Sequence, residues 1–66
     1  MNSFLFKRKT NGATITVEAF YIEPMHMWGV SCKVNERHVD HAQSDDPWFT
    51  ARAMIEQASM NLPVGT

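Results

Sequence analysis

The dipeptide Asn11-Gly12 constrains the fold of this chain more than any other feature of the sequence. Asn and Gly accept the positive φ angles of a type I′ turn, which closes a two-residue β-hairpin. The runs on either side, at 3–9 and 13–23, are rich in β-branched and aromatic residues. We therefore expect these two runs to pair as antiparallel strands.

The register of this hairpin predicts an apolar side of the sheet. If Thr10 faces Ala13 across the turn, alternate side chains of both strands fall on the same side. That side then carries five apolar residues: Phe4, Phe6, Ile15, Val17 and Ala19.

A third strand is expected at 27–34, after a four-residue loop in which Pro24 suits a type I turn. Pairing of Ile22 with Met27 extends the apolar side across this strand. The inward residues are Trp28, Val30, Cys32 and Val34. The stretch PMHMWGVSC therefore has the period of two of a half-buried strand, with the cysteine as a small hydrophobe.

A fourth strand is expected at 37–41, after a turn at 35–36. A two-residue turn places Val39 inward beside Cys32, and this is the register we predict. A three-residue turn would instead point His38 and Asp40 inward.

The segment 46–62 is predicted to form one helix. Asp45 or Asp46 can cap its free N–H groups, Pro47 suits its first turn, and Pro63 ends it. Its apolar residues form one stripe: Trp48, Ala51, Met54, Ile55, Ala58 and Leu62. A helix of about 16 residues is roughly 24 Å long and can lie across one face of such a sheet.

The expected fold is α+β: a four-stranded antiparallel meander with one C-terminal helix packed on one face, over the single small domain 1–66. A chain of 66 residues buries only about 60% of its unfolded surface, which leaves it marginally stable alone. We expect a second subunit or another protein to add stability.

One helix covers one side of the sheet, so the other side faces water or a partner. On that side Leu5, Phe20, Ile22 and Met27 form an apolar cluster, which predicts an interaction surface. An alternative is a bend or bulge near Phe20, which would turn Phe20 and Ile22 into the core and Tyr21 out of it.

We expect the chain to be a homodimer or to bind another protein, as an accessory or inhibitory factor. Self-association can use the open sheet face, or pairing of edges through the first strand with its sequence FLF. The sequence leaves both routes open.

The alternative function is nucleic-acid binding through Lys7, Lys9, Lys33 and Arg37, with Phe20 as a stacking platform for a base. The formal net charge of -1 argues against it, because no general attraction to phosphates results.

No motif predicts catalysis or a metal site, and we expect neither an enzyme nor a cofactor. Met27 and Trp28 alternate on a strand and cannot share an ion, and His38 and His41, three residues apart, are expected to point to opposite faces. Cys32 is expected to be buried and inert.

The N-terminal segment resembles no export signal and no run approaches the roughly 20 apolar residues of a membrane span, so we expect a cytoplasmic protein. The order of strands and helix recurs in unrelated small proteins, and no family signature is present.

Overall fold

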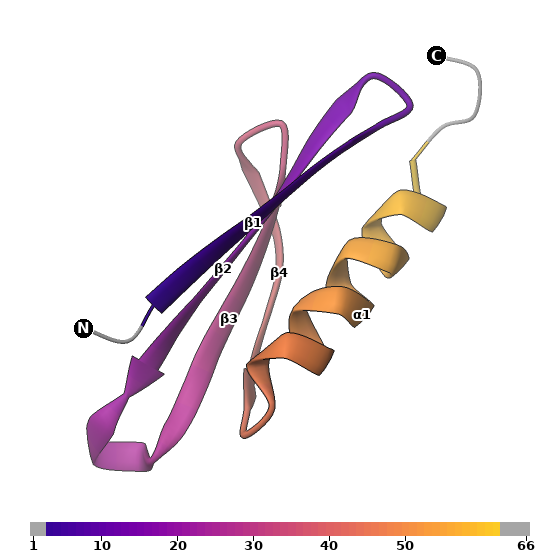
Figure 1. Ribbon diagram of the computed structural model, residues 1–66. Helices are drawn as coiled ribbons and strands as arrows, with labels where there is room; N and C mark the ends of the chain where they lie inside the picture. Colours follow the sequence, from indigo (N-terminus) through magenta and orange to yellow (C-terminus); the bar gives the residue numbers. More distant parts are fainter. Residues whose placement is uncertain (1–2, 63–66) are drawn as a thin grey trace.

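The computed structural model describes residues 3–62 as an antiparallel sheet followed by one helix (Figure 1). The elements are β1 (Ser3–Thr10), β2 (Ala13–Ile22), a 3-10 turn η1 (Glu23–Met25), β3 (Met27–Val34), β4 (Arg37–Ser44) and α1 (Pro47–Met60). The strands lie in the order β1-β2-β3-β4, and each pairs antiparallel with the next. The predicted α+β meander with one C-terminal helix is confirmed.

Two hairpins close with the same kind of turn. Asn11 and Gly12 have φ angles of 50° and 79°, and Asn35 and Glu36 have φ angles of 50° and 71°. Positive φ at both central residues defines the type I′ turn, whose twist matches that of the flanking strands. The predicted pairing of Thr10 with Ala13 is confirmed.

The predicted loop between the second and third strands is also confirmed, because Ile22 pairs with Met27. Within it, the N–H of His26 donates to the carbonyl of Glu23 at 3.1 Å, and His26 adopts a φ of 53°. From Ile22 back to Ile15, β2 pairs with β3 without a register shift.

The fourth strand differs from the prediction. The two-residue turn forms, since Val34 pairs with Arg37, but a bulge at Val39 shifts the later register so that Asp40, and not Val39, lies opposite Cys32. A bulge inserts one unpaired residue and exchanges the faces of the residues beyond it. The predicted pairing of Val39 with Cys32 is therefore wrong, although Val39 still lies on the helix side, where it lines a small hollow with Cys32 and Met54. β4 continues to Ser44, beyond the expected end at residue 41.

The helix begins at Pro47 and ends at Met60. The N–H of Phe49 donates to the side chain of Asp46 at 3.2 Å, which is the N-cap bond that helices with Asp at this position form. Pro63, expected to end the helix, lies outside the described residues. No helix within residues 3–62 has the length and apolar character needed to cross a bilayer.

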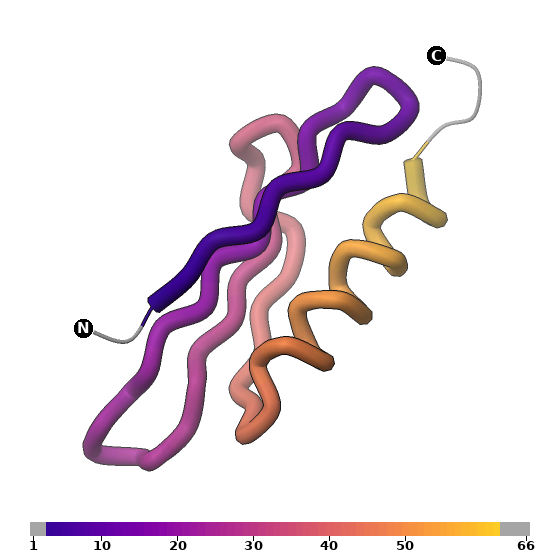
Figure 2. The backbone as a smooth tube through the Cα atoms, viewed as in Figure 1, coloured from indigo at the N-terminus to yellow at the C-terminus, as the bar shows by residue number. Residues whose placement is uncertain are grey.

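The core lies between α1 and the centre of the sheet. α1 packs mainly over β2 and β3 and touches β1 and β4 less. The buried residues that pack together as its central cluster are Ile15, Val17, Ala19, Val30, Cys32, Ala51 and Met54. Figures 1 and 2 show the helix along one side of the sheet, and no other described element lies on the opposite side.

Candidate functional site

The face of the sheet away from α1 is open, and apolar side chains gather at one end of it. Phe20 lies opposite Gly29, and Ile22 lies opposite Met27. A Cβ placed on Gly29 would lie 2.7 Å from two ring carbons of Phe20 and 3.3 Å from Cδ1 of Ile22. The Phe20 ring therefore lies over the backbone of Gly29, with Ile22 beside it.

We name this surface the outer patch, with members Leu5, Phe20, Ile22, Met25 and Met27. Leu5 is 54% exposed and Phe20 44%, whereas Ile22 and Met27 are half-buried. The pairing of Ser3 with Phe20 and of Leu5 with Glu18 makes Leu5 a diagonal neighbour of Phe20. Because β2 has no bulge here and Phe20 stays exposed, the alternative that buries Phe20 is not observed.

Met25 joins the outer patch, although the sequence placed it only in a turn. The side-chain amide of Gln43 donates to the sulfur of Met25 at 3.7 Å, and Gln43 lies opposite Gly29. The 3-10 turn η1 thus folds its exposed methionine toward the end of the sheet that carries Phe20.

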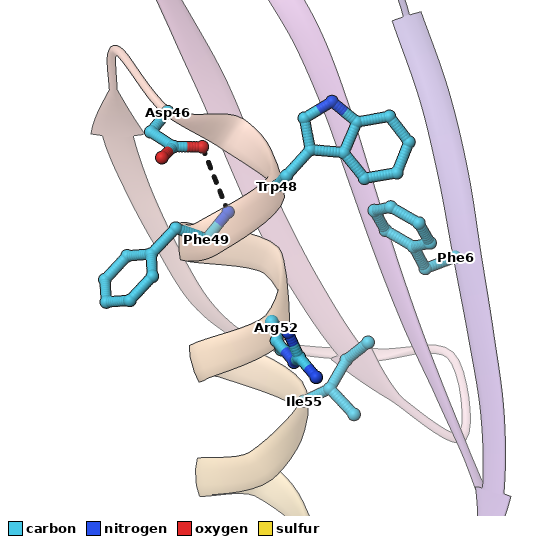
Figure 3. A pocket seen from close by; sticks show the side chains of 6 residues that line it. All are labelled: Phe6, Asp46, Trp48, Phe49, Arg52 and Ile55. Carbon is cyan, nitrogen blue, oxygen red and sulfur yellow. Dashed lines mark hydrogen bonds between the residues drawn. The ribbon is translucent and has the colours of Figure 1, made fainter.

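A second apolar surface lies on the helix side of the sheet, beside β1. A groove of about 470 Å³ is lined there by Phe6, Asp46, Trp48, Phe49, Arg52 and Ile55 (Figure 3). The Trp48 ring stacks on Phe4, with centroids 4.7 Å apart and planes 10° apart, and meets Phe6 edge-on at 5.0 Å. We name this surface the aromatic groove.

The sequence pattern did not predict the aromatic groove, because the helical period placed Trp48 on the buried stripe of the helix. Trp48 is 62% exposed and Phe49 70%, since α1 lies over β2 and β3 and leaves Trp48 at the margin. Successive helical residues point about 100° apart, so the neighbours Trp48 and Phe49 cannot both face the sheet. That adjacency was the signal for an exposed aromatic.

The basic residues divide between the two faces. Lys7 and Lys33 lie in one row of the open face, on either side of Thr16, and line a hollow of about 420 Å³. Lys9, opposite Thr14, belongs to the next row. Arg37 instead lines a hollow with Ala58 and Leu62 of the helix side, so the structure does not bring all four predicted residues together.

The bulge at Val39 also changes the face of the sheet on which His41 lies. His38 lies opposite Lys33 and His41 opposite Ser31, so both lie on the open face, with ring centroids 6.2 Å apart. The expectation that they point to opposite faces is wrong, because it assumed an unbroken strand. Within residues 3–62 no group of three or more His, Cys, Asp or Glu side chains is placed to hold a metal ion.

Cys32 is 1% exposed and its thiol is free. Burial, and secondly the negative charge of the nearby Asp40, raise the pKa of the Cys32 thiol above its ordinary value. A thiol that is buried and protonated is a poor nucleophile, because the thiolate is the reactive form.

Together these features define a small α+β domain with a meander sheet, one open face and a second apolar surface along strand β1. Comparison with known proteins found no match: no family model, no curated protein and no solved structure is similar enough to place the chain in a family.

Proposed function

We propose that this chain is a small cytoplasmic protein-interaction module, homodimeric, which acts by binding and not by catalysis. In this proposal the outer patch covers a surface of another protein, so the chain works as an accessory or inhibitory factor. Apolar surface that a small domain leaves open in a contiguous area marks such interaction sites.

The position of Phe20 carries the proposal. Its ring lies over Gly29 and is 44% exposed, on a face that α1 does not cover. An aromatic ring held against a sheet offers a large apolar area at little cost in side-chain entropy, which is why aromatic residues are enriched among the residues that dominate binding energy.

A catalytic role has less support than a binding role. The one cysteine, Cys32, is buried, and burial raises the pKa of its thiol. Asp46, the acidic residue of the aromatic groove, accepts the N-cap hydrogen bond of Phe49 and so has a structural role there.

The test substitutes Phe20→Asp and compares it with Thr16→Asp, which adds the same charge on the same face of β2 but outside the outer patch. Immobilised wild-type protein is expected to retain specific proteins from an extract of its source cells. Thr16→Asp is expected to retain the same proteins, and Phe20→Asp to lose them, because a carboxylate in an apolar contact must be desolvated.

Circular dichroism of both variants checks the fold. Phe20→Asp is expected to stay folded, since the substituted side chain is half exposed. Retention of the same proteins by folded Phe20→Asp would show that the outer patch is not the binding surface, whereas its global unfolding would show that Phe20 acts as a core residue.

Nucleic-acid binding is a second candidate, favoured by the row in which Lys7 and Lys33 flank Thr16. Fluorescence anisotropy with labelled RNA and single-stranded DNA at low salt is its test. Binding is expected to weaken as salt rises and to weaken further in Lys7→Glu, because phosphate contacts release counterions. No anisotropy change at high protein concentration eliminates this candidate.

A further inference from the structure

Strand β1 has one edge that no other strand of residues 3–62 occupies, since it pairs with β2 alone. The hydrogen bonds of Thr14, on the neighbouring strand β2, show which backbone groups of β1 point to this free edge. The N–H of Thr14 donates to Oδ1 of Asn35 at 3.0 Å, and its carbonyl accepts the N–H of Asn35 at 2.9 Å. Thr14 thus turns its backbone groups toward β3 and away from Lys9, its partner on β1.

In an antiparallel pair the backbone groups of successive residues point alternately toward and away from the partner strand. Lys9 therefore points its N–H and C=O to the free edge, and so do the alternate residues Lys7, Leu5 and Ser3. An edge of this kind is a template for another strand.

The two edges of the sheet differ in how well they are protected. β4 carries the bulge at Val39 and consists largely of charged and polar residues, which are two of the features that prevent edge pairing. β1 pairs with β2 without a register shift, and its first half carries the apolar run Phe4–Phe6.

We propose that a second copy of this chain pairs antiparallel with β1 about a two-fold axis at Leu5, which joins the two sheets into one. This inference deepens the proposed function, on whose homodimeric part it rests, and leaves Phe20, Ile22 and Met27 of both copies open for another protein. A two-fold interface is the commonest arrangement of soluble homo-oligomers.

The register follows from the side chains. With the axis at Leu5, Leu5 faces its own copy, Phe4 faces the partner's Phe6, and Ser3 faces the partner's Lys7. All apolar residues of the strand then face apolar residues, and no cation faces a cation. An axis at Lys7 would set two lysines against each other, and like charges directly opposite are destabilising.

The aromatic groove lies at the level of this axis. Trp48 contacts both Phe4 and Phe6, the two residues that flank Leu5. The pairing therefore brings two Trp48 side chains toward each other over four phenylalanines. Since strands lie about 4.8 Å apart and α1 lies over β2 and β3, the helix axes would be roughly 19 Å apart, which leaves room for one aromatic side chain from each helix.

The charged side chains of the two copies are also complementary in this dimer. The two helices run antiparallel and overlap at their first turns. Arg52 of one copy, which lines the groove, then lies near the N-terminal end of the other helix, where Asp45 and Asp46 stand. Only residues 3–7 of β1 and the groove take part in this contact, so we expect a weak dimer that dissociates at roughly micromolar concentrations.

Cysteine cross-linking of the full chain tests the register. In a hydrogen-bonded antiparallel pair the Cα atoms are about 5.5 Å apart, within the range that a disulfide spans. Leu5→Cys is expected to form a covalent dimer at least about tenfold faster than the matched variants Lys9→Cys and Phe20→Cys. Cys32 is buried and remains in all three proteins.

Sedimentation equilibrium from about 1 µM to about 1 mM gives the second readout. Wild-type protein and Phe20→Asp are expected to dimerise, and Leu5→Lys, whose new charge faces its own copy, is expected to stay monomeric and folded. Faster cross-linking through Phe20→Cys, or monomeric wild-type protein throughout, would overturn the edge dimer. Neither result bears on the binding of another protein by the outer patch, which the Phe20→Asp experiment tests separately.

Discussion

At the scale of single residues, the contact between Phe20 and Gly29 decides the character of the open face. Gly in a strand leaves its backbone uncovered and is unfavourable for that reason. Here the Phe20 ring, which lies over it, supplies the missing cover, as cross-strand aromatic residues do for glycine in designed sheets. The same contact holds the ring in place while leaving it 44% exposed.

Gly29→Ala is expected to destabilise the fold by about 1 kcal/mol, because the new Cβ forces the Phe20 ring off the sheet. The ring is the far end of a side chain and can move, so the cost stays moderate. In a Phe20→Ala background the same substitution is expected to stabilise by about 0.5 kcal/mol, since Ala is favoured over Gly in a strand. Urea denaturation of the four proteins measures both effects; equal effects in the two backgrounds would contradict the contact.

Cys32 predicts a specific dependence of stability on pH. Because burial and Asp40 raise the pKa of the folded thiol, folding favours the protonated form. This contribution is fully present below the pKa of the unfolded thiol and is lost as the pH rises through the raised pKa of the folded one. Thermal unfolding between neutral and strongly alkaline pH is expected to show a steeper loss for wild-type protein than for Cys32→Ala. Parallel curves would rule this out.

At the scale of elements, turns and bulges set which residues share a face. The sequence signal Asn-Gly identified one type I′ turn, but the second such turn uses Asn35-Glu36, and Glu36 has a φ of 71°. A residue with a Cβ is strained in this region, and glycine is not. The turn still forms because the strands on both sides pair.

Glu36→Gly is therefore expected to raise the free energy of unfolding by about 1 kcal/mol, after allowing for the greater entropy of glycine in the unfolded chain. Glu36→Ala removes the same side chain without relieving the backbone, and is expected to change stability little. Gly12→Ala, at a φ of 79°, should destabilise by a similar amount. Denaturant titration compares the three variants with wild-type protein; equal stability of Glu36→Gly and Glu36→Ala would refute the strain.

At the scale of the whole molecule, one helix is too narrow to cover a four-stranded sheet. α1 covers the centre of one face of the sheet. The margin of that face beside β1 remains exposed as the aromatic groove, and the opposite face is open. A domain of this size with a core on one side only is expected to gain stability from association.

Thermal unfolding of wild-type protein is therefore expected to depend on concentration. A dimer that binds only folded chains raises the midpoint by about 5 °C between about 5 µM and 500 µM, as mass action requires for a chain of this length. Leu5→Lys is the control, with a midpoint that does not change. A wild-type midpoint independent of concentration would contradict self-association.

The sequence alone determined the hairpins, the pairing of β1, β2 and β3, the two-residue turn at Asn35-Glu36 and the presence of one C-terminal helix. These features depend on local turn chemistry and on the alternation of side chains, both of which can be read from neighbouring residues. For the same reason it placed Leu5, Phe20, Ile22 and Met27 on the open face.

Tertiary structure decided the rest. The bulge at Val39, which moves Asp40 to the helix side and His41 to the open face beside His38, includes no glycine or proline that would predict it. The lateral position of α1 over β2 and β3 left Trp48 exposed, although the helical period placed it on the buried stripe. Both outcomes depend on how the helix packs against the twisted sheet. That packing is determined by the helix and the sheet together and cannot be read from either segment alone.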